Sequence, residues 1–118
     1  KFLGHVAPEE LGEIVASAFA MVYVSLFEGF GIPIVEAMSC NVPVITSNIT
    51  SMPEAAGDAA LLVNPNSVEE ISSAMRKMLN DDIRTLLIEK GELQVKKFSW
   101  NITADKLWKC CERVLNNA

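Results

Sequence analysis

The sequence predicts an α/β domain with a small, Rossmann-like parallel sheet and flanking helices. Short apolar runs alternate with short helical patterns over residues 1–66. These runs are apolar enough to be covered on both faces, which is typical of strands in a parallel sheet. From residue 67 to residue 118 the pattern is helical throughout. The 118 residues are expected to form one domain with a real core.

Seven elements are expected in the first part of the chain. Four apolar runs are predicted strands, the first being only the tail of one: 1–3, 21–25, 42–46 and 61–63. Three helices lie between them: 8–19, which is amphipathic, then Gly31 or Pro33 to residue 39, then 52–57. Doubly wound sheets usually have five or six strands, so the domain is expected to be truncated at its N-terminus.

Three further helices are expected after residue 66. Ser67 and Glu70 form a capping box that opens the first of them, which runs to about residue 79. Asp81 or Asp82 opens the second, which runs to about residue 96. The third is expected over 101–115, and its side chains available for packing are Leu107, Trp108 and Val114.

The charges are divided unevenly along the chain, although the net charge is only −5. Residues 2–75 contain nine acids and no Lys or Arg, whereas residues 76–118 contain nine cations and six acids. A nucleic-acid-binding role is therefore not expected, because the first half has no basic face. A diphosphate bound in that half would meet backbone amides but no cationic side chain, so its cations would have to come from elsewhere.

The cysteines and the apolar segments indicate a soluble, cytoplasmic protein. The longest nearly apolar stretch, 15–27, contains two serines and is too short to span a bilayer. No secretory signal is visible. The three cysteines are odd in number and lack metal-ligand spacing, so no metal site is predicted. The adjacent Cys110 and Cys111 suit a reduced, helical context.

The most informative segment is 28–36, with the sequence EGFGIPIVE. It joins a predicted strand to a short helix opened by Pro33. A glycine-containing turn of this kind presents free backbone N–H groups at a helix N-terminus, where anions bind. Glu28 and Glu36 flank the turn, and carboxylates repel phosphate, so hydroxyls or a cation are their expected partners. Amides for phosphate and carboxylates for a polyol predict a nucleotide-sugar site.

Structural explanations compete with this interpretation. Glu28 could be a solvated loop acid, and Glu36, placed in the first turn of its helix, could serve only the helix dipole. Gly29 and Gly31 could be turn residues that need a positive φ. The two glutamates could also be the acid pair of a glycosidase. The functional interpretation expects three loops to line one crevice at the carboxyl ends of the strands: the loop at Gly4 and His5, the loop at 28–31 and the loop at 47–51.

On these residues the chain resembles the C-terminal nucleotide-sugar-binding domain of the group 1 glycosyltransferases, which have the GT-B fold. The two-glutamate signature of that family, two acids separated by seven residues, stands here as Glu28 and Glu36. Further matches follow in order at 41–45, 51–54, 57–63 and 98–100. Val24 replaces a common proline and Asn41 a common glycine, but Asn tolerates the left-handed conformation.

The resemblance implies transfer of a sugar from a nucleoside diphosphate to an acceptor hydroxyl, with retention of configuration. It implies no metal requirement and no cofactor besides the donor substrate. Glu28 would meet the donor sugar as the catalytic residue, and Glu36 would hold the ribose hydroxyls. The backbone amides of residues 30–32 would bind sugar oxygens or the diphosphate. The implied donor-binding residues are Gly29, Phe30, Gly31, Ile32 and Glu36.

The resemblance also implies partners. Residues 1–118 would be a partial C-terminal donor-binding domain, inactive alone, of an enzyme whose N-terminal domain binds a sugar or lipid-linked acceptor. That enzyme is expected in the cytoplasm or at the cytoplasmic face of a membrane. Alternatives are a non-catalytic sugar-nucleotide-binding relative, a GT-B epimerase or phosphorylase, and a flavodoxin-like interaction module. UDP, GDP and ADP donors all remain open.

Overall fold

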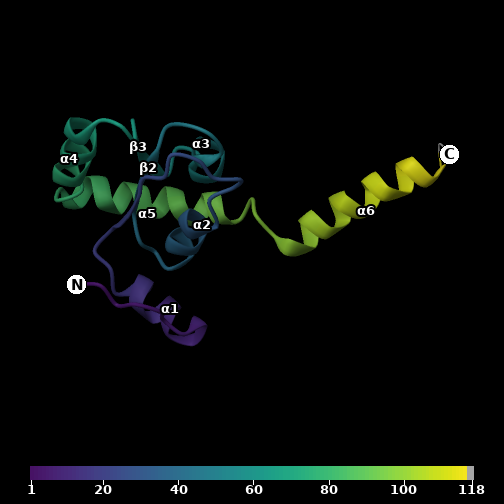
Figure 1. The fold of residues 1–118 in the computed structure, drawn as a ribbon, viewed down its shortest axis with the longest axis horizontal. Coiled ribbons are helices and arrows are strands. Elements are labelled where there is room, and N and C mark those ends of the chain that lie inside the picture. Colours follow the sequence, from purple (N-terminus) through teal and green to yellow (C-terminus); the bar gives the residue numbers. More distant parts are fainter. Residues whose placement is uncertain (117–118) are drawn as a thin grey trace.

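The computed structural model describes residues 1–116, so the predicted helical segment 67–118 extends two residues beyond the described part. Within it the elements follow one another along the chain as shown in Figure 1. They are α1 (Pro8–Ala16), β1 (Met21–Tyr23), α2 (Ile32–Ser39), β2 (Val44–Ser47), α3 (Met52–Ala56), β3 (Ala60–Val63), α4 (Val68–Lys77), α5 (Asp81–Val95) and α6 (Trp100–Asn116).

The sheet is parallel, with the strand order β1-β2-β3. Met21 is in register with Val44, and Val44 with Ala60. The central strand β2 is buried along its whole length. Val44 belongs to a core cluster made with α2 and α3, and the next residue, Ile45, belongs to a second cluster made with α4 and α5. Helices therefore cover both faces of the sheet, which confirms the predicted α/β class.

Local capping decides where the two helices after β3 begin. The Ser67 hydroxyl accepts a hydrogen bond from the Glu70 N–H at 3.2 Å, as predicted, but the Glu70 carboxylate accepts from the N–H of Asn64 instead. Only half of the capping box therefore forms. At α5 the cap is Asn80, whose Oδ1 accepts from the Ile83 N–H at 3.1 Å. Asp81 and Asp82, the two residues predicted to begin the helix, lie in its first turn, where carboxylates interact favourably with the helix dipole.

The predicted strand at residues 1–3 is wrong. These residues have no regular structure, and Phe2 is fully exposed. A strand needs a partner for its N–H and C=O groups, and within residues 1–116 the only strand paired with β1 is β2. The described sheet therefore has three strands rather than four. The strand predicted at 21–25 ends at Tyr23, because Val24 and Ser25 already belong to the loop that leads to α2.

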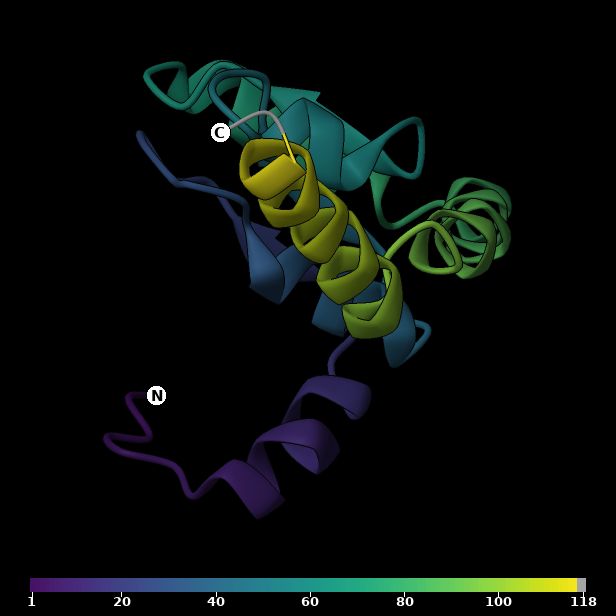
Figure 2. The same cartoon turned by 90° about the vertical axis from the view of Figure 1, so that its right-hand side faces the viewer.

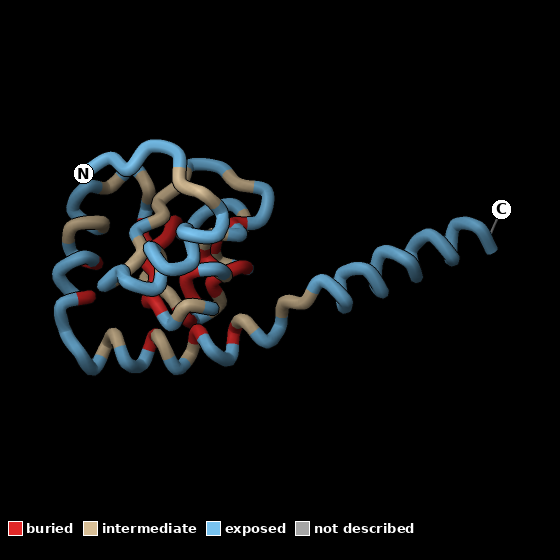
Figure 3. The backbone as a smooth tube through the Cα atoms, turned by 90° about the horizontal axis from the view of Figure 1, so that it is seen from below, coloured by how far each residue is buried: buried red, intermediate tan, exposed pale blue. Residues whose placement is uncertain are grey.

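Helix α6 projects away from the rest of the molecule (Figure 1, and viewed from its C-terminal side in Figure 2). All of its described residues are exposed, as the blue tube in Figure 3 shows. The apolar side chains predicted to be available for packing therefore add nothing to the core of the described residues. Among the helices described here, none combines the length and the hydropathy that crossing a membrane requires.

Candidate functional site

Glu28 lies in the loop between β1 and α2 and is held by two hydroxyls. The Tyr23 Oη donates to Glu28 Oε1 at 2.5 Å, and the Ser25 Oγ donates to the same oxygen at 3.1 Å. The Glu28 side chain is half-buried. It is therefore a fixed carboxylate at the carboxyl end of the sheet rather than a freely solvated loop acid.

Hydroxyls from β2 and from the residue before α3 fix the backbone of the same loop. Three side chains donate to three backbone carbonyls between the end of β1 and Glu28, and two of the donors are fully buried. The bonds are Thr46 Oγ1 to Tyr23 O at 2.8 Å, Ser47 Oγ to Ser25 O at 2.5 Å and Ser51 Oγ to Glu28 O at 3.0 Å. The loop at 47–51 thus meets the Glu28 loop, as the sequence predicted. Gly4 and His5 are exposed and follow no strand of the described residues, so their predicted place at the carboxyl end of a strand is wrong.

The hydrogen bond to Glu28 also changes the pKa of the Tyr23 hydroxyl. Accepting that bond, the carboxylate raises the pKa of the Tyr23 hydroxyl, and burial and the negative charge of Glu28 raise it further. An ordinary tyrosine titrates at about pH 10. The Tyr23 hydroxyl therefore remains a proton donor throughout the neutral range.

Glu36 lies on α2, just beyond the first turn in which the sequence placed it. The helix begins at Ile32, between the two predicted starts, so Glu36 is its fifth residue and the first turn contains no acid. The dipole explanation for Glu36 is therefore wrong, because that effect falls off within the first turn. The Glu36 side chain is exposed and free to meet a ligand.

The two loop glycines differ. Gly31 is the N-cap of α2 with φ +98°, and a Cβ there would lie 3.1 Å from Ile34 Cδ1 and 3.2 Å from Met52 Sδ. The positive φ favours glycine here, and an added Cβ would also press on these two side chains. Gly29 is not among the described residues with positive φ, and a Cβ there would meet nothing within 4 Å. The prediction of a positive φ is confirmed at Gly31 and wrong at Gly29.

Among the described residues, two that are not glycine have a positive φ. Asn41, at the end of α2, has φ 57°, as predicted. Thr50 has φ 55°, and nothing in the sequence indicated it. A β-branched residue is a genuine outlier in this region. Thr50 directly precedes Ser51, which holds the Glu28 carbonyl, so the strained backbone lies next to the loop that carries the predicted site.

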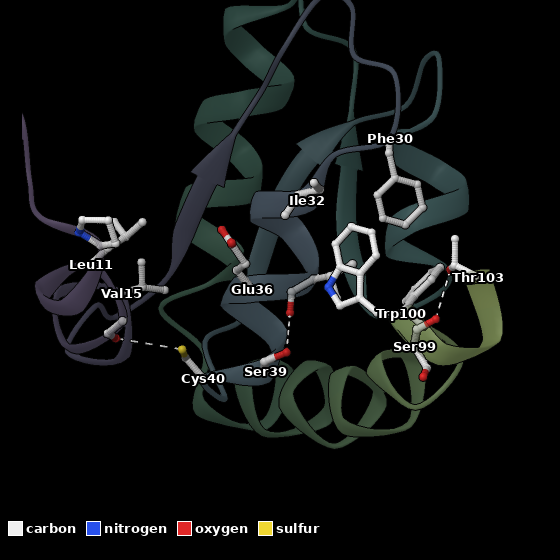
Figure 4. A pocket seen from close by; sticks show the side chains of 14 residues that line it. Leu11, Val15, Phe30, Ile32, Glu36, Ser39, Cys40, Ser99, Trp100 and Thr103 are labelled. Carbon is white, nitrogen blue, oxygen red and sulfur yellow. Dashed lines mark hydrogen bonds between the residues drawn. The ribbon is translucent and has the colours of Figure 1, made fainter. Parts of the chain in front are cut away.

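A groove of about 730 Å³ lies between α1, α2 and the junction of α5 with α6 (Figure 4). Phe30, Ile32 and Glu36 line it, whereas Glu28, Gly29 and Gly31 do not. The ring of Phe30 packs edge-on against Phe98, with the ring centres 5.3 Å apart. The other lining residues are Pro8, Leu11, Gly12, Val15, Val35, Ser39, Cys40, Ser99, Trp100 and Thr103.

Glu36 is the only charged side chain in the lining of this groove. In Figure 4 it lies between Val15 on one side and Trp100 on the other. A charged acceptor between mostly apolar and aromatic walls suits a ligand with hydroxyls and a flat, weakly polar part. Sequence reasoning missed the contributions of α1 and of residues 98–103, because nothing in the sequence places them beside α2.

The comparison with known protein families decides the identity. Residues 1–94 match the family described as "Glycosyl transferases group 1". The chain belongs to the group 1 glycosyltransferase family. The predicted resemblance is therefore confirmed, and with it the GT-B assignment of this parallel sheet and its flanking helices.

Two mannosyltransferases are similar to most of the chain. It is 48% identical over 101 residues to "O-antigen chain mannosyltransferase B" of Escherichia coli, covering 85% of this chain and 26% of that protein. It is 34% identical over 104 residues to "MMP alpha-(1->4)-mannosyltransferase" of Mycolicibacterium hassiacum, covering 84% of this chain and 25% of that protein. The chain thus spans about a quarter of the length of these relatives.

A solved structure shows the same architecture. Sucrose-phosphate synthase from Thermosynechococcus elongatus superimposes on the whole chain with a TM-score of 0.85 and 26% sequence identity. The match covers 31% of that structure. The three-stranded sheet with its helices is therefore also part of this longer protein.

Proposed function

We propose that residues 1–118 form the donor-binding part of a longer glycosyltransferase. The enzyme transfers a sugar from a nucleoside diphosphate to an acceptor hydroxyl with retention of configuration. One observation carries the proposal: a single short segment, the loop at 28–31 and the start of α2, joins a fixed carboxylate at the carboxyl end of the sheet to the charged side chain of Glu36 in a mostly apolar groove. Membership of the group 1 family supports the reaction class.

In this proposal Glu36 accepts hydrogen bonds from the two ribose hydroxyls. Its carboxylate is exposed at the groove, and the apolar and aromatic lining can cover the rest of the nucleoside. A charge-assisted hydrogen bond contributes about 1.5–3 kcal/mol, so two of them would account for a large share of donor affinity.

Glu28 meets the donor sugar. Both of its hydrogen bonds in residues 1–116 go to Oε1, which leaves Oε2 to accept from a sugar hydroxyl. The N–H groups of Phe30, Gly31 and Ile32 donate to no acceptor within the described residues. They stand at the start of α2, where the helix favours anions, and would bind sugar oxygens or the diphosphate, with Gly29 completing the loop.

The proposal includes no metal ion and no cofactor. Residues 2–75 contain no Lys or Arg, so the remaining charge of the diphosphate would be neutralised by cations of the parent enzyme outside this region. The acceptor is a sugar or a lipid-linked sugar held by the rest of that enzyme. Because Cys110 and Cys111 are free and exposed, a reducing compartment is favoured. We therefore place the enzyme in the cytoplasm or at the cytoplasmic face of a membrane.

The test uses the full-length protein that carries this chain. It is incubated with UDP-, GDP- and ADP-sugars and an acceptor, and nucleotide release and the anomeric configuration of the product are measured. A mannose donor is tried first, because two of the relatives described above are mannosyltransferases. Turnover with retained configuration supports the proposal. Donor binding without transfer would instead identify a non-catalytic relative.

The site is tested by Glu36→Ala. We expect affinity for the nucleoside diphosphate to fall at least about tenfold with Tm unchanged. Glu89→Ala is the matched control, since Glu89 is an exposed acid on α5 outside the groove. Calorimetry that finds the same nucleotide affinity in both variants would remove Glu36 from the site.

A further inference from the structure

Tyr23 is anchored at both ends of the residue. Its backbone carbonyl accepts the hydrogen bond of the buried Thr46, and its ring packs against the core cluster shared by α2, α3 and β2. Tyr23 is also the last residue of β1, so its backbone is fixed by pairing with β2. Its hydroxyl is therefore held in one place and cannot follow the Glu28 carboxylate if that group moves.

The orientation of the Glu28 carboxylate follows from this anchor. The hydroxyls of Tyr23 and Ser25 both donate to Oε1, and Oε2 has no partner within residues 1–116. Two donors converging on one oxygen restrict rotation of the carboxylate about its last side-chain bond. The carboxylate therefore presents the other oxygen, Oε2, in a fixed direction.

We propose that Tyr23, assisted by Ser25, is a positioning residue that turns Oε2 of Glu28 toward the donor sugar. This inference rests on the role proposed above for Glu28. Tyr23 touches no substrate itself, and its effect passes through the carboxylate. A carboxylate that rotates freely would spend part of its time in unproductive orientations, which lowers the rate of transfer more than the affinity for nucleotide.

The first test is spectroscopic and needs no activity. Tyr23 is the only tyrosine within residues 1–118. In the full-length protein, subtracting the titration of the matching Tyr23→Phe protein isolates the ultraviolet absorbance of this one tyrosinate. Wild-type Tyr23 should ionise above the ordinary pKa of about 10. Glu28→Gln, which removes the negative charge, should bring the ionisation back toward that value, with circular dichroism confirming that both proteins are folded. If Tyr23 ionised at the same pH in both folded proteins, the proposed coupling between Tyr23 and Glu28 would be wrong.

The second test is kinetic and uses the full-length protein. Tyr23→Phe keeps the ring and removes the hydroxyl, so kcat should fall about tenfold or more while affinity for free nucleoside diphosphate stays the same. In the Glu28→Gln background the same change should have no further effect, because Tyr23 acts through Glu28. Ser73→Ala, on the exposed face of α4, is the control for loss of a hydroxyl.

The outcomes separate this inference from the function on which it rests. Unchanged kcat in Tyr23→Phe, or a loss of equal size in the Glu28→Gln background, would show that Tyr23 only packs. A wild-type protein that transfers no sugar would contradict the proposed function instead. In that case the tyrosinate titration still decides whether Tyr23 and Glu28 are coupled.

Discussion

Glu28 and Glu36 are chemically identical side chains with different surroundings. Glu28 is half-buried and accepts two hydroxyl hydrogen bonds, whereas Glu36 is exposed in an apolar groove and lies in the second turn of α2. A fixed carboxylate is suited to an interaction that must be aligned during a reaction. An exposed one at a groove is suited to binding. The environments therefore support separate roles for the two residues.

The separation predicts the kinetics of Glu28→Gln in the full-length enzyme. The substitution keeps the shape of the side chain and removes its charge. We expect kcat to fall more than the affinity for free nucleoside diphosphate, because the sugar is absent from the free nucleotide. Steady-state kinetics and calorimetry measure the two quantities. Near-normal turnover would show that Glu28 has only a structural role.

Asn41 gives a stability prediction at the same scale. Its φ of 57° is left-handed, so Asn41→Gly should be nearly neutral, whereas Asn41→Val should destabilise the fold by about 1–2 kcal/mol. Asn41→Ala separates the general cost of a Cβ from the extra cost of β-branching. Urea unfolding measures all three variants. Equal stability of the Val and Gly variants would contradict the prediction.

Single residues could be predicted where one conformational rule decides the outcome. Asn41 and Gly31 were predicted because few residue types adopt a positive φ. Thr50 could not be predicted, since its conformation is imposed by the surrounding loop against its own preference. The hydrogen bond from Tyr23 to Glu28 could not be predicted either, because it depends on how the loop after β1 folds back and not on the spacing of the two residues.

At the scale of elements, α5 fixes the position of α3. The buried Gln94 on α5 donates to the carbonyls of Glu54 and Ala55 at 3.2 and 3.1 Å, and its Oε1 accepts from Lys97 at 2.7 Å. These bonds satisfy carbonyls at the end of α3. Because Ser51, directly before α3, holds the carbonyl of Glu28, the long helix supports the site from the opposite side.

The close approach of α3 and α5 predicts the effect of Gly57→Ala. Gly57 has φ 57° and ψ −132°, and a Cβ there would lie 2.5 Å from the Gln94 Oε1. We expect a loss of about 1–3 kcal/mol from the backbone conformation alone, with the clash adding to it. The double variant with Gln94→Ala should lose less than the sum of the two single changes. Additive losses in urea unfolding would contradict the clash.

The ion pair between α5 and the residue after Gly57 predicts a pH dependence. Lys90 Nζ lies 2.9 Å from Asp58 Oδ2, and its hydrogen bond and charge lower the pKa of Asp58. A carboxyl with a lowered pKa in the folded state stabilises above its unfolded value of about 3.9. That contribution is lost as the pH falls through the folded value.

The measurement compares wild type with Lys90→Met. The unfolding free energy of the variant should fall less steeply than that of wild type as the pH is lowered below about 4. The difference should be small and should shrink in high salt, because Asp58 is exposed. Identical slopes at low salt would show that the pair contributes nothing.

Elements could be predicted from the sequence where their own residues decide their form. The strands at 21–25, 42–46 and 61–63 and all six helices are present with shifted ends. The error at residues 1–3 has a different cause, because a strand depends on a neighbour that local pattern cannot reveal. Likewise the groove needed α1 and residues 98–103 beside α2, an arrangement that only tertiary packing determines.

At the scale of the whole molecule, the described residues divide into a packed body and the projecting α6. Exposed apolar side chains lie along α6, among them Trp100, Leu107 and Trp108. In the sheet of the described residues 1–116, β1 is an edge strand that pairs only with β2. Edge strands and exposed apolar stripes both favour association with other surfaces.

We therefore predict that purified residues 1–118 catalyse no sugar transfer and bind nucleoside diphosphates only weakly. No Lys or Arg between residues 2 and 75 offsets the phosphate charge. The chain also matches only about a quarter of the length of each relative described above. Without a bound acceptor, the alignment of the two reactants, which can supply about 7–11 kcal/mol, is missing. The unpaired edge of β1 should also make the isolated chain associate or precipitate.

The assay incubates the purified chain with UDP-, GDP- and ADP-sugars and measures nucleotide release, titration heats and the oligomeric state. The full-length protein at the same concentration is the positive control, and its Glu36→Ala variant gives the baseline for a damaged donor site. We expect no multiple turnover and no saturable heat at micromolar concentrations of the isolated chain. Micromolar binding of any of the three donors would contradict the prediction. The cation-free loop at 28–36 would then be a sufficient donor site, held together by helix amides and the two glutamates alone.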